Sequence, residues 1–130
     1  MSETISFQPE TLKQVQKIIA RYPEGRQKSA LIPVLHIAQK EFGGWLAVPV
    51  MDYVAEVLSI KPIEVYEVAT FYSMFNMNPV GKYVFEVCQT GPCMLNGSDE
   101  ILNHIRTTLN IKNGEKIWFT CGRRDHVIRW

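Results

Sequence analysis

The chain has 130 residues, of which 46% are hydrophobic and 21% are charged. This length suits one ordinary domain or two very small ones, and the composition excludes both a large multidomain enzyme and an intrinsically disordered chain. The formal net charge at pH 7 is only +1, so the charge balance gives no reason to expect a nucleic acid or another polyanion as partner.

The first half of the chain predicts four helices that together form an N-terminal helical bundle. Apolar residues recur at helical spacing from Pro9 to about residue 75. The helices are separated by proline and glycine signals. These signals are Pro9 and Tyr22-Pro23 for the first helix, Gly43-Gly44 at the end of the second, and Pro49 and Pro62 at the starts of the last two. Helical spacing also favours core packing for Phe71 and Phe75 over a role in docking a partner.

The pattern changes at the turn signal Asn78-Pro79-Val80-Gly81, which predicts a domain boundary between residues 78 and 79. The alternating pattern of side chains over residues 83–87 predicts a strand. Ser98-Asp99-Glu100 is expected to cap a following helix. Residues 117–120 predict a second strand. A strand, a crossover helix and a strand favour a parallel βαβ unit, so the fold class is α+β, with residues 1–78 helical and residues 79–130 mixed.

Neither a membrane span nor a secretory signal is expected. The longest uncharged run, residues 68–81, contains two asparagines and a proline and is too short to cross a bilayer. Residues 1–10 carry two glutamates and no apolar segment. We therefore expect a cytoplasmic, reducing setting, in which Cys88, Cys93 and Cys121 are metal-binding, redox-active or inert rather than a disulfide framework.

Cys88 and Cys93 form a C-x4-C pair at the end of the first predicted strand, an edge where α/β sheets usually carry ligand sites. Four intervening residues are too many for the C-x-x-C of zinc ribbons and thioredoxins, and they match the opening of ferredoxin-type clusters. Gly91-Pro92 predicts a turn that aims both sulfur atoms at one centre. Backbone N–H groups around Gly91 and Gly97 are expected to stabilise thiolates there.

Two other interpretations of the cysteines stay open on spacing alone. Free cysteines are often small buried hydrophobes. Alternatively, Cys88, Cys93, Cys121 and His126 form a Cys3His zinc site, because Cys121 and His126 repeat the same interval, although zinc sites usually have tighter spacing. An iron-sulfur cluster normally needs four ligands, so with three cysteines a ligand is either missing or borrowed.

Longer motifs carry a resemblance to a known family. They read VYEVATFYSMF at residues 65–75, GK at 81–82 and VCQTGPCMLNGS at 87–98. Three shorter motifs add to this resemblance: YP at 22–23, SALIPVL at 29–35 and GGWL at 43–46. Together they closely resemble the family of the E subunit of NADH-quinone oxidoreductase, respiratory complex I, through about residue 115.

The resemblance implies an electron-transfer protein in which an N-terminal helical bundle precedes a thioredoxin-like [2Fe-2S] ferredoxin-type domain, here an incomplete βαβ portion. Cys88 and Cys93 match the first of the family's two cysteine pairs and are, by resemblance, ligands of the [2Fe-2S] cluster. The implied partners are the flavoprotein subunit that binds FMN and NADH and other peripheral-arm subunits of complex I. Related chains serve NAD-reducing hydrogenases and formate dehydrogenases. The implied location is the cytoplasm, at the inner face of the membrane through the complex and without direct membrane insertion.

The sequence departs from the family after about residue 115. The family's second pair, C-x3-C, has no counterpart, because Asp125, His126 and Trp130 fall where a glutamate and the two cysteines are expected. Cys121 falls at a strand position and receives no ligand role, and an exposed imidazole is expected for His126. One hypothesis is that the tail is a truncation or a reading-frame disruption, which sequencing the DNA past the stop would test. The competing function is a cluster-free or zinc-stabilised interaction module that keeps the docking scaffold.

Overall fold

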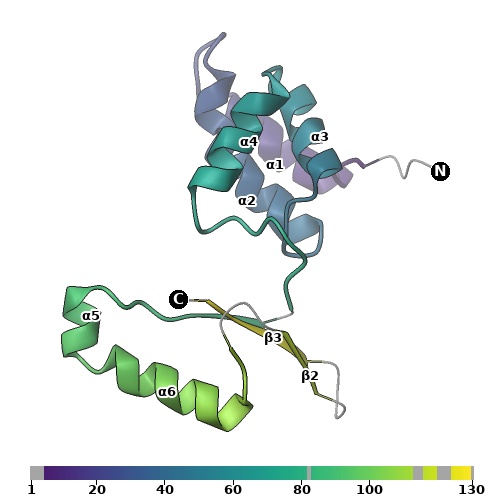
Figure 1. The fold of residues 1–130 in the computed structure, drawn as a ribbon. Coiled ribbons are helices and arrows are strands. Elements are labelled where there is room, and N and C mark those ends of the chain that lie inside the picture. Colours follow the sequence, from purple (N-terminus) through teal and green to yellow (C-terminus); the bar gives the residue numbers. More distant parts are fainter. Residues whose placement is uncertain (1–4, 82, 113–115, 120–123, 130) are drawn as a thin grey trace. The chain divides into compact units, whose positions relative to one another are not determined.

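The computed structural model describes residues 5–81 and 83–112, and the backbone of residues 116–119 and 124–129. The chain divides into two compact units, Met1–Pro79 and Val80–Trp130. The first unit is helical, whereas the second combines two helices with a three-stranded sheet (Figure 1). Each unit has a hydrophobic cluster of its own.

The first unit contains four α-helices and one short 3-10 helix, which Figure 1 shows grouped together. Proline lies in the first turn of three of the α-helices, as the sequence predicts, because the N–H that proline lacks has no helical partner at that position. The remaining α-helix, the second in chain order, begins directly after the 3-10 helix. The elements are α1 (Pro9–Ile19), η1 (Gln27–Ala30), α2 (Leu31–Glu41), α3 (Val48–Leu58) and α4 (Pro62–Phe71).

The core of the helical unit is made by the apolar faces of all four helices. Its largest fully buried side chains include Leu31, Leu35 and Leu58, each no more than 1% exposed. Phe75 is also buried, as helical spacing predicts, but Phe71 is 80% exposed, so its predicted place in the core is wrong. The reason is that α4 ends at Phe71, so the helical spacing that related the two rings does not continue to Phe75.

A polar network holds the segment after α4 against the end of α2. The backbone N–H of Asn76 donates to Gln39 Oε1 at 2.7 Å, and Asn76 Nδ2 donates to the carbonyl of Gly44 at 2.8 Å. In return, the N–H of Leu46 donates to the Asn76 carbonyl at 2.7 Å. Gly43 and Gly44 both have φ of +85°, and this left-handed turn ends α2 where the glycine pair predicts. The last residues of the helical unit are therefore tied down by hydrogen bonds as well as by Phe75.

The second unit consists of β1 (Tyr83–Glu86), α5 (Gly91–Leu95), α6 (Ser98–Leu109), β2 (Lys116–Phe119) and β3 (Arg124–Arg129). The strand order is β1-β3-β2, with β3 parallel to β1 and antiparallel to β2. From β1 the chain runs out to α5, and α6 leads back to the sheet (Figure 1). Within the described side chains the core of this unit is small: Leu102 and Ile111 are buried, with three partly buried neighbours, Val87, Ile105 and Leu109.

The predicted pairing of the two strands is wrong. The strand expected at residues 117–120 is present as β2, but it lies at the far edge of the sheet, and β3 is the parallel neighbour of β1. Only residues 120–123 link β2 to β3. Such a short link joins antiparallel neighbours, whereas the parallel pair needs a long crossover, which residues 87–123 provide between β1 and β3. Once β3 lies beside β1, β2 is left with the outer position.

The start of α6 also differs from the expected cap. Gly97, with φ of +89°, is the N-cap residue, and no side chain caps the helix. Ser98 is the first helical residue; it is buried, and its Oγ has no hydrogen-bond partner among the described residues. Asp99 and Glu100 do lie in the first turn, where negative charge favours the helix dipole. Across the described part of the chain, no helix combines the length and the apolar character needed to cross a membrane.

Candidate functional site

The two cysteines of the C-x4-C motif lie just after β1. Cys88 follows β1 by two residues and is exposed, whereas Cys93 lies in the five-residue helix α5 and is partly buried. A helix at Cys93 replaces the turn that Gly91-Pro92 predicts. Gly91 and Pro92 open this helix, and Asn96 ends it by donating from Nδ2 to the Pro92 carbonyl at 2.8 Å. The helix therefore fixes where Cys93 stands relative to Cys88.

The two thiols interact with each other and with one hydroxyl. The titrations of Cys88 and Cys93 influence each other, and Cys88 Sγ lies 3.1 Å from Thr90 Oγ1. The pKa of the Cys88 thiol is lowered, chiefly by the Thr90 hydroxyl and then by the Thr90 backbone N–H and Cys93. The pKa of Cys93 is raised, because its interaction with Cys88, including repulsion by the Cys88 thiolate, favours the protonated Cys93 thiol. Cys88 is thus the first of the pair to ionise.

Thr90 is the site residue that sequence reasoning missed. The only signal for it was a hydroxyl two residues beyond a cysteine, which is not specific. The expected role of Gly97 is not found, since its backbone N–H donates to the Met94 carbonyl at 3.1 Å. A different contact links the cysteine loop to α6: Gln89 Nε2 donates to Asp99 Oδ1 at 3.1 Å.

The alternative zinc set has two further members, Cys121 and His126. Cys121, like Trp130, lies outside the described residues. The backbone of His126 lies in β3, paired with Tyr83 at the start of β1, while Cys88 follows the other end of the strand. Residues 83–86 alone rise about 10 Å. The register therefore does not support His126 as a ligand beside Cys88, and among the described residues no group of three or more His, Cys, Asp and Glu could hold a metal ion.

The donor set fits one half of a [2Fe-2S] site. Thiolates are the usual ligands of such clusters, and each iron takes two protein ligands. Cys88 is exposed and Cys93 is partly buried, so both thiols are accessible. Thiols must lose their protons to bind a metal, and the lowered pKa of Cys88 favours that loss at the first of the two. The described residues supply one such pair.

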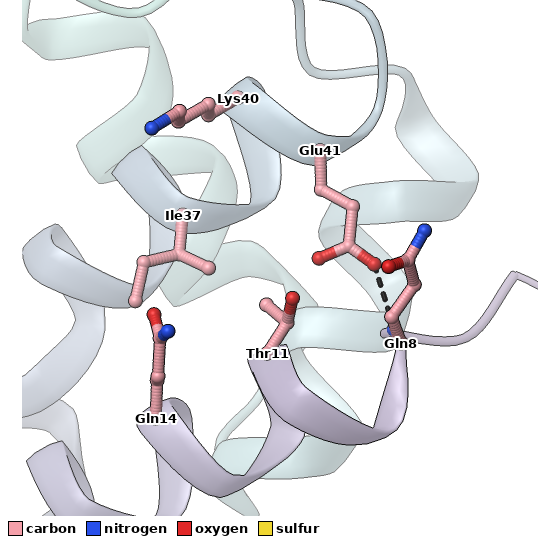
Figure 2. Close-up of a pocket in the computed structure, with 6 residues that line it drawn as sticks. All are labelled: Gln8, Thr11, Gln14, Ile37, Lys40 and Glu41. Atoms are coloured by element: carbon pink, nitrogen blue, oxygen red, sulfur yellow. Dashed lines mark hydrogen bonds between the residues drawn. The ribbon is translucent and has the colours of Figure 1, made fainter.

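A pocket in the helical unit lies between α1 and α2 and has a volume of about 440 Å³ (Figure 2). It is lined by Gln8, Thr11, Gln14, Ile37, Lys40 and Glu41. Glu41 Oε1 accepts a hydrogen bond from the backbone N–H of Gln8 at 2.7 Å, so this carboxylate caps the start of α1. Its second oxygen is buried and has no partner among the described residues. The lining contains no thiol or imidazole, and we assign Glu41 a structural role.

Comparison with known proteins gives the class. Residues 15–117 match the family model of the thioredoxin-like [2Fe-2S] ferredoxin. The match covers most of the chain, and the chain belongs to this family.

Similarity to individual proteins of known name is more specific than the match to the family. The chain is 46% identical over 112 residues to the E subunit of the NADH-quinone oxidoreductase of Rickettsia felis, an alignment that covers 86% of this chain and 67% of that protein. It is 46% identical over 112 residues to the protein of the same name from Rickettsia prowazekii, covering 86% and 63%. It is 47% identical over 109 residues to the mitochondrial NADH dehydrogenase [ubiquinone] flavoprotein 2 of Dictyostelium discoideum, covering 84% and 44%. These similarities confirm the family resemblance, and the chain spans about two thirds or less of the length of these relatives.

Proposed function

We propose that this chain is an electron-transfer subunit of an NADH-quinone oxidoreductase, with Cys88 and Cys93 as ligands of a [2Fe-2S] cluster. The observation that carries the proposal is the pair of interacting thiols after β1, found in a chain of the thioredoxin-like [2Fe-2S] ferredoxin family. The names of the relatives support the choice of complex. When bound, such a cluster accepts and passes on one electron at a time.

The chain's own residues have three tasks in this function. The two thiols hold iron, and the Thr90 hydroxyl and backbone N–H stabilise the Cys88 thiolate. The short helix α5 keeps Cys93 in place, and the contact between Gln89 and Asp99 ties the loop to α6. Hydrogen bonds to sulfur and exposure to water are what tune the reduction potential of such a site. Thr90 is therefore a residue expected to affect that potential.

The proposal includes the partners and the location. The electron donor is the flavoprotein subunit that carries FMN and binds NADH, and the other neighbours are peripheral-arm subunits of complex I. The site lies on the cytoplasmic side, at the inner face of the membrane through the complex. Within the chain, residues 1–78 form the N-terminal helical bundle and residues 79–130 form the incomplete thioredoxin-like domain. The division into two compact units supports this assignment.

The test begins with the protein purified without oxygen. We expect a red-brown colour, bound iron and sulfide, and an electron paramagnetic resonance signal after reduction with dithionite. NADH should give the same signal once the flavoprotein subunit is added. Cys88→Ser and Cys93→Ser should remove the colour and leave the helical circular dichroism signal unchanged, whereas Cys121→Ser serves as the matched control and should keep the colour.

A second function, a cluster-free or zinc-stabilised interaction module, is favoured by one observation. The described residues offer two metal-binding side chains at the site where four are needed, while Phe71 and other apolar side chains are exposed and available for docking. A colourless protein that binds the flavoprotein subunit would establish the module and contradict electron transfer. Stoichiometric zinc in that protein would identify the zinc-stabilised form.

A further inference from the structure

The residues on both sides of Cys88 are held by the same helix, α6. Before the cysteine, Val87 packs against the small apolar cluster that includes Leu102 of α6. After the cysteine, Gln89 Nε2 donates to Asp99 Oδ1 at 3.1 Å, in the first turn of the same helix. Cys88 therefore lies between one apolar and one polar contact to a single element.

The second cysteine is connected to α6 by a different route. Cys93 lies in α5, and its carbonyl accepts the backbone N–H of Asn96 at 3.1 Å. The backbone N–H of Gly97 donates to the Met94 carbonyl at 3.1 Å, and Gly97 is itself the N-cap residue of α6. Residues 96–97 alone separate α5 from α6. Both cysteines are thus fixed relative to the start of one helix.

The start of α6 is packed well enough to act as an anchor. Ser98 is 6% exposed and Leu102 is 2% exposed, on either side of Asp99 in the sequence. A hydrogen bond to an acceptor on a packed helix restricts the loop that carries the donor. Two ligands that are already held in their binding arrangement bind more tightly, because less conformational freedom is lost on binding.

We propose that Gln89 and Asp99 are positioning residues of the candidate site: their hydrogen bond holds Cys88 relative to Cys93 so that both thiolates bind one metal atom. This inference rests on the proposed function for the identity of the metal, which is one iron of the cluster. It assigns a role to two residues that act through the cysteines and that the C-x4-C spacing does not indicate.

The test measures how well the two thiols act together in the metal-free full chain. The probe is phenylarsine oxide, whose trivalent arsenic forms bonds to both sulfur atoms, while the two thiol protons and the arsenic-bound oxygen leave as water. Every variant also carries Cys121→Ser, so that Cys88 and Cys93 are the thiols present. Affinity is measured by competition with a soluble dithiol, with the bound fraction determined by mass spectrometry.

Variants separate the contact from the charge at the start of the helix. Gln89→Leu removes the donor and Asp99→Ala removes the acceptor, and each should weaken arsenical binding about two- to tenfold. The double variant should be no weaker than either single variant, because both remove the same contact. Asp99→Asn keeps an acceptor oxygen and should restore the wild-type affinity. All variants should keep the helical circular dichroism signal, because the altered side chains are exposed.

Glu100→Ala is the matched control. It removes the other acidic side chain from the first turn of α6, whereas the hydrogen bond from Gln89 goes to Asp99. Its arsenical affinity should equal that of the wild type. After reconstitution with ferrous iron and sulfide, Gln89→Leu and Asp99→Ala should lose their colour to a chelator about two- to tenfold faster than Glu100→Ala.

Two results would overturn the inference. Unchanged arsenical binding in Gln89→Leu and Asp99→Ala would mean that the contact does not position the thiols, and the proposed electron-transfer function would stand. Equal losses in Asp99→Ala and Glu100→Ala would mean that the charge at the start of α6, and not the contact, is responsible. Arsenical binding needs no iron, so a colourless wild type with contact-dependent binding would support the positioning and contradict the proposed cluster.

Discussion

At the scale of single residues, Thr90 decides which of the two thiols ionises first. Its hydroxyl and its backbone N–H both lower the pKa of Cys88, whereas the pKa of Cys93 is raised, chiefly by Cys88. A hydrogen bond to the charged form of a group lowers the pKa of that group when the charge is negative. The asymmetry of the pair therefore comes from a neighbour that the cysteine motif does not include.

Thr90→Val should raise the pKa of the Cys88 thiol in the metal-free protein, because it removes the hydroxyl and keeps the side-chain shape. Thr90→Ser is the matched control and should leave that pKa close to the wild-type value. The measurement is the pH dependence of the rate of iodoacetamide labelling at Cys88, followed by mass spectrometry. Identical profiles for the wild type and Thr90→Val would show that the hydroxyl does not stabilise the thiolate.

Ser59 is a residue in an unfavourable backbone conformation. It ends α3 with φ of +53°, in the left-handed region, and the next N–H, that of Ile60, donates to the Ala55 carbonyl at 3.0 Å. Glycine is the residue that best tolerates this position. We expect Ser59→Gly to raise the free energy of unfolding by about 0.5–1 kcal/mol in urea titrations. Ser29→Gly, in the right-handed helix η1, should instead lower it by about 0.5 kcal/mol. A loss of stability in Ser59→Gly would contradict the assignment.

At the scale of elements, one ion pair links η1 to α4. Lys28 Nζ lies 2.9 Å from Glu64 Oε1, and Glu64 Oε2 also accepts the backbone N–H of Lys61 at the start of α4. The hydrogen bond to Lys28 lowers the pKa of Glu64 below 4.5, and the hydrogen bond to Glu64 raises the pKa of Lys28 above 10.5. The pair therefore joins residues 36 positions apart, one in each element, and Glu64 also caps the start of α4.

The stabilisation by this pair should depend on pH. Because the pKa of Glu64 is lowered by folding, its contribution is present above pH 4.5 and is lost as pH falls through the lowered pKa. Because the pKa of Lys28 is raised, its contribution is present below pH 10.5 and is lost as pH rises through the raised pKa. Glu64→Gln, which keeps an acceptor for Lys61, should lower the melting temperature at pH 7 and have little effect at pH 2.

The matched control for that prediction is Glu56→Gln, an exposed glutamate of α3. It removes the same charge from a carboxylate that does not pair with Lys28. Its melting temperature should follow that of the wild type at both pH values. Equal shifts for the two variants at pH 7 would mean that net charge, and not the Lys28 contact, causes the effect.

At the scale of the whole molecule, the described side chains of the two units differ in how much core they form. The cluster of the helical unit contains sixteen buried residues, including Leu35, which is 0% exposed. The cluster described for the second unit contains two buried residues, Leu102 and Ile111. A small core gives little hydrophobic stabilisation against the conformational entropy of the chain. We therefore expect the second unit to open more readily than the first.

Two substitutions that shorten a buried side chain should show this difference in stability, measured by hydrogen exchange and urea denaturation. Leu35→Ala leaves a cavity in the larger core and should lower the free energy of unfolding of the helical unit by about 2–5 kcal/mol. Leu102→Ala should abolish amide protection in α6 and β1 in the metal-free protein while leaving the helical unit unchanged. If Leu102→Ala instead lowered the stability of both units equally, the chain would unfold as one cooperative body.

The sequence by itself determined the α-helices of the first unit, two strands and α6 of the second, and the family to which the candidate site belongs. Proline at helix starts, the Gly43-Gly44 turn and the periodicity of apolar residues fix where the helices lie, because these signals act over a few neighbouring residues. The C-x4-C motif and the longer motifs around it identified the family, and the matched family model confirms it. Whether Cys88 and Cys93 ligate iron stays a prediction.

The tertiary structure decided what the sequence patterns did not show. Strand pairing is one case: β3, and not β2, lies beside β1, because the order of strands follows from the lengths of the links and not from the strand sequences. The exposure of Phe71 is another, because it depends on where α4 ends. The unequal acidity of Cys88 and Cys93 is the third, since a loop and a short helix bring the two thiols and Thr90 together. The first case depends on where the chain returns in space, and the other two depend on where α4 ends and on the short helix α5, which the sequence patterns did not predict.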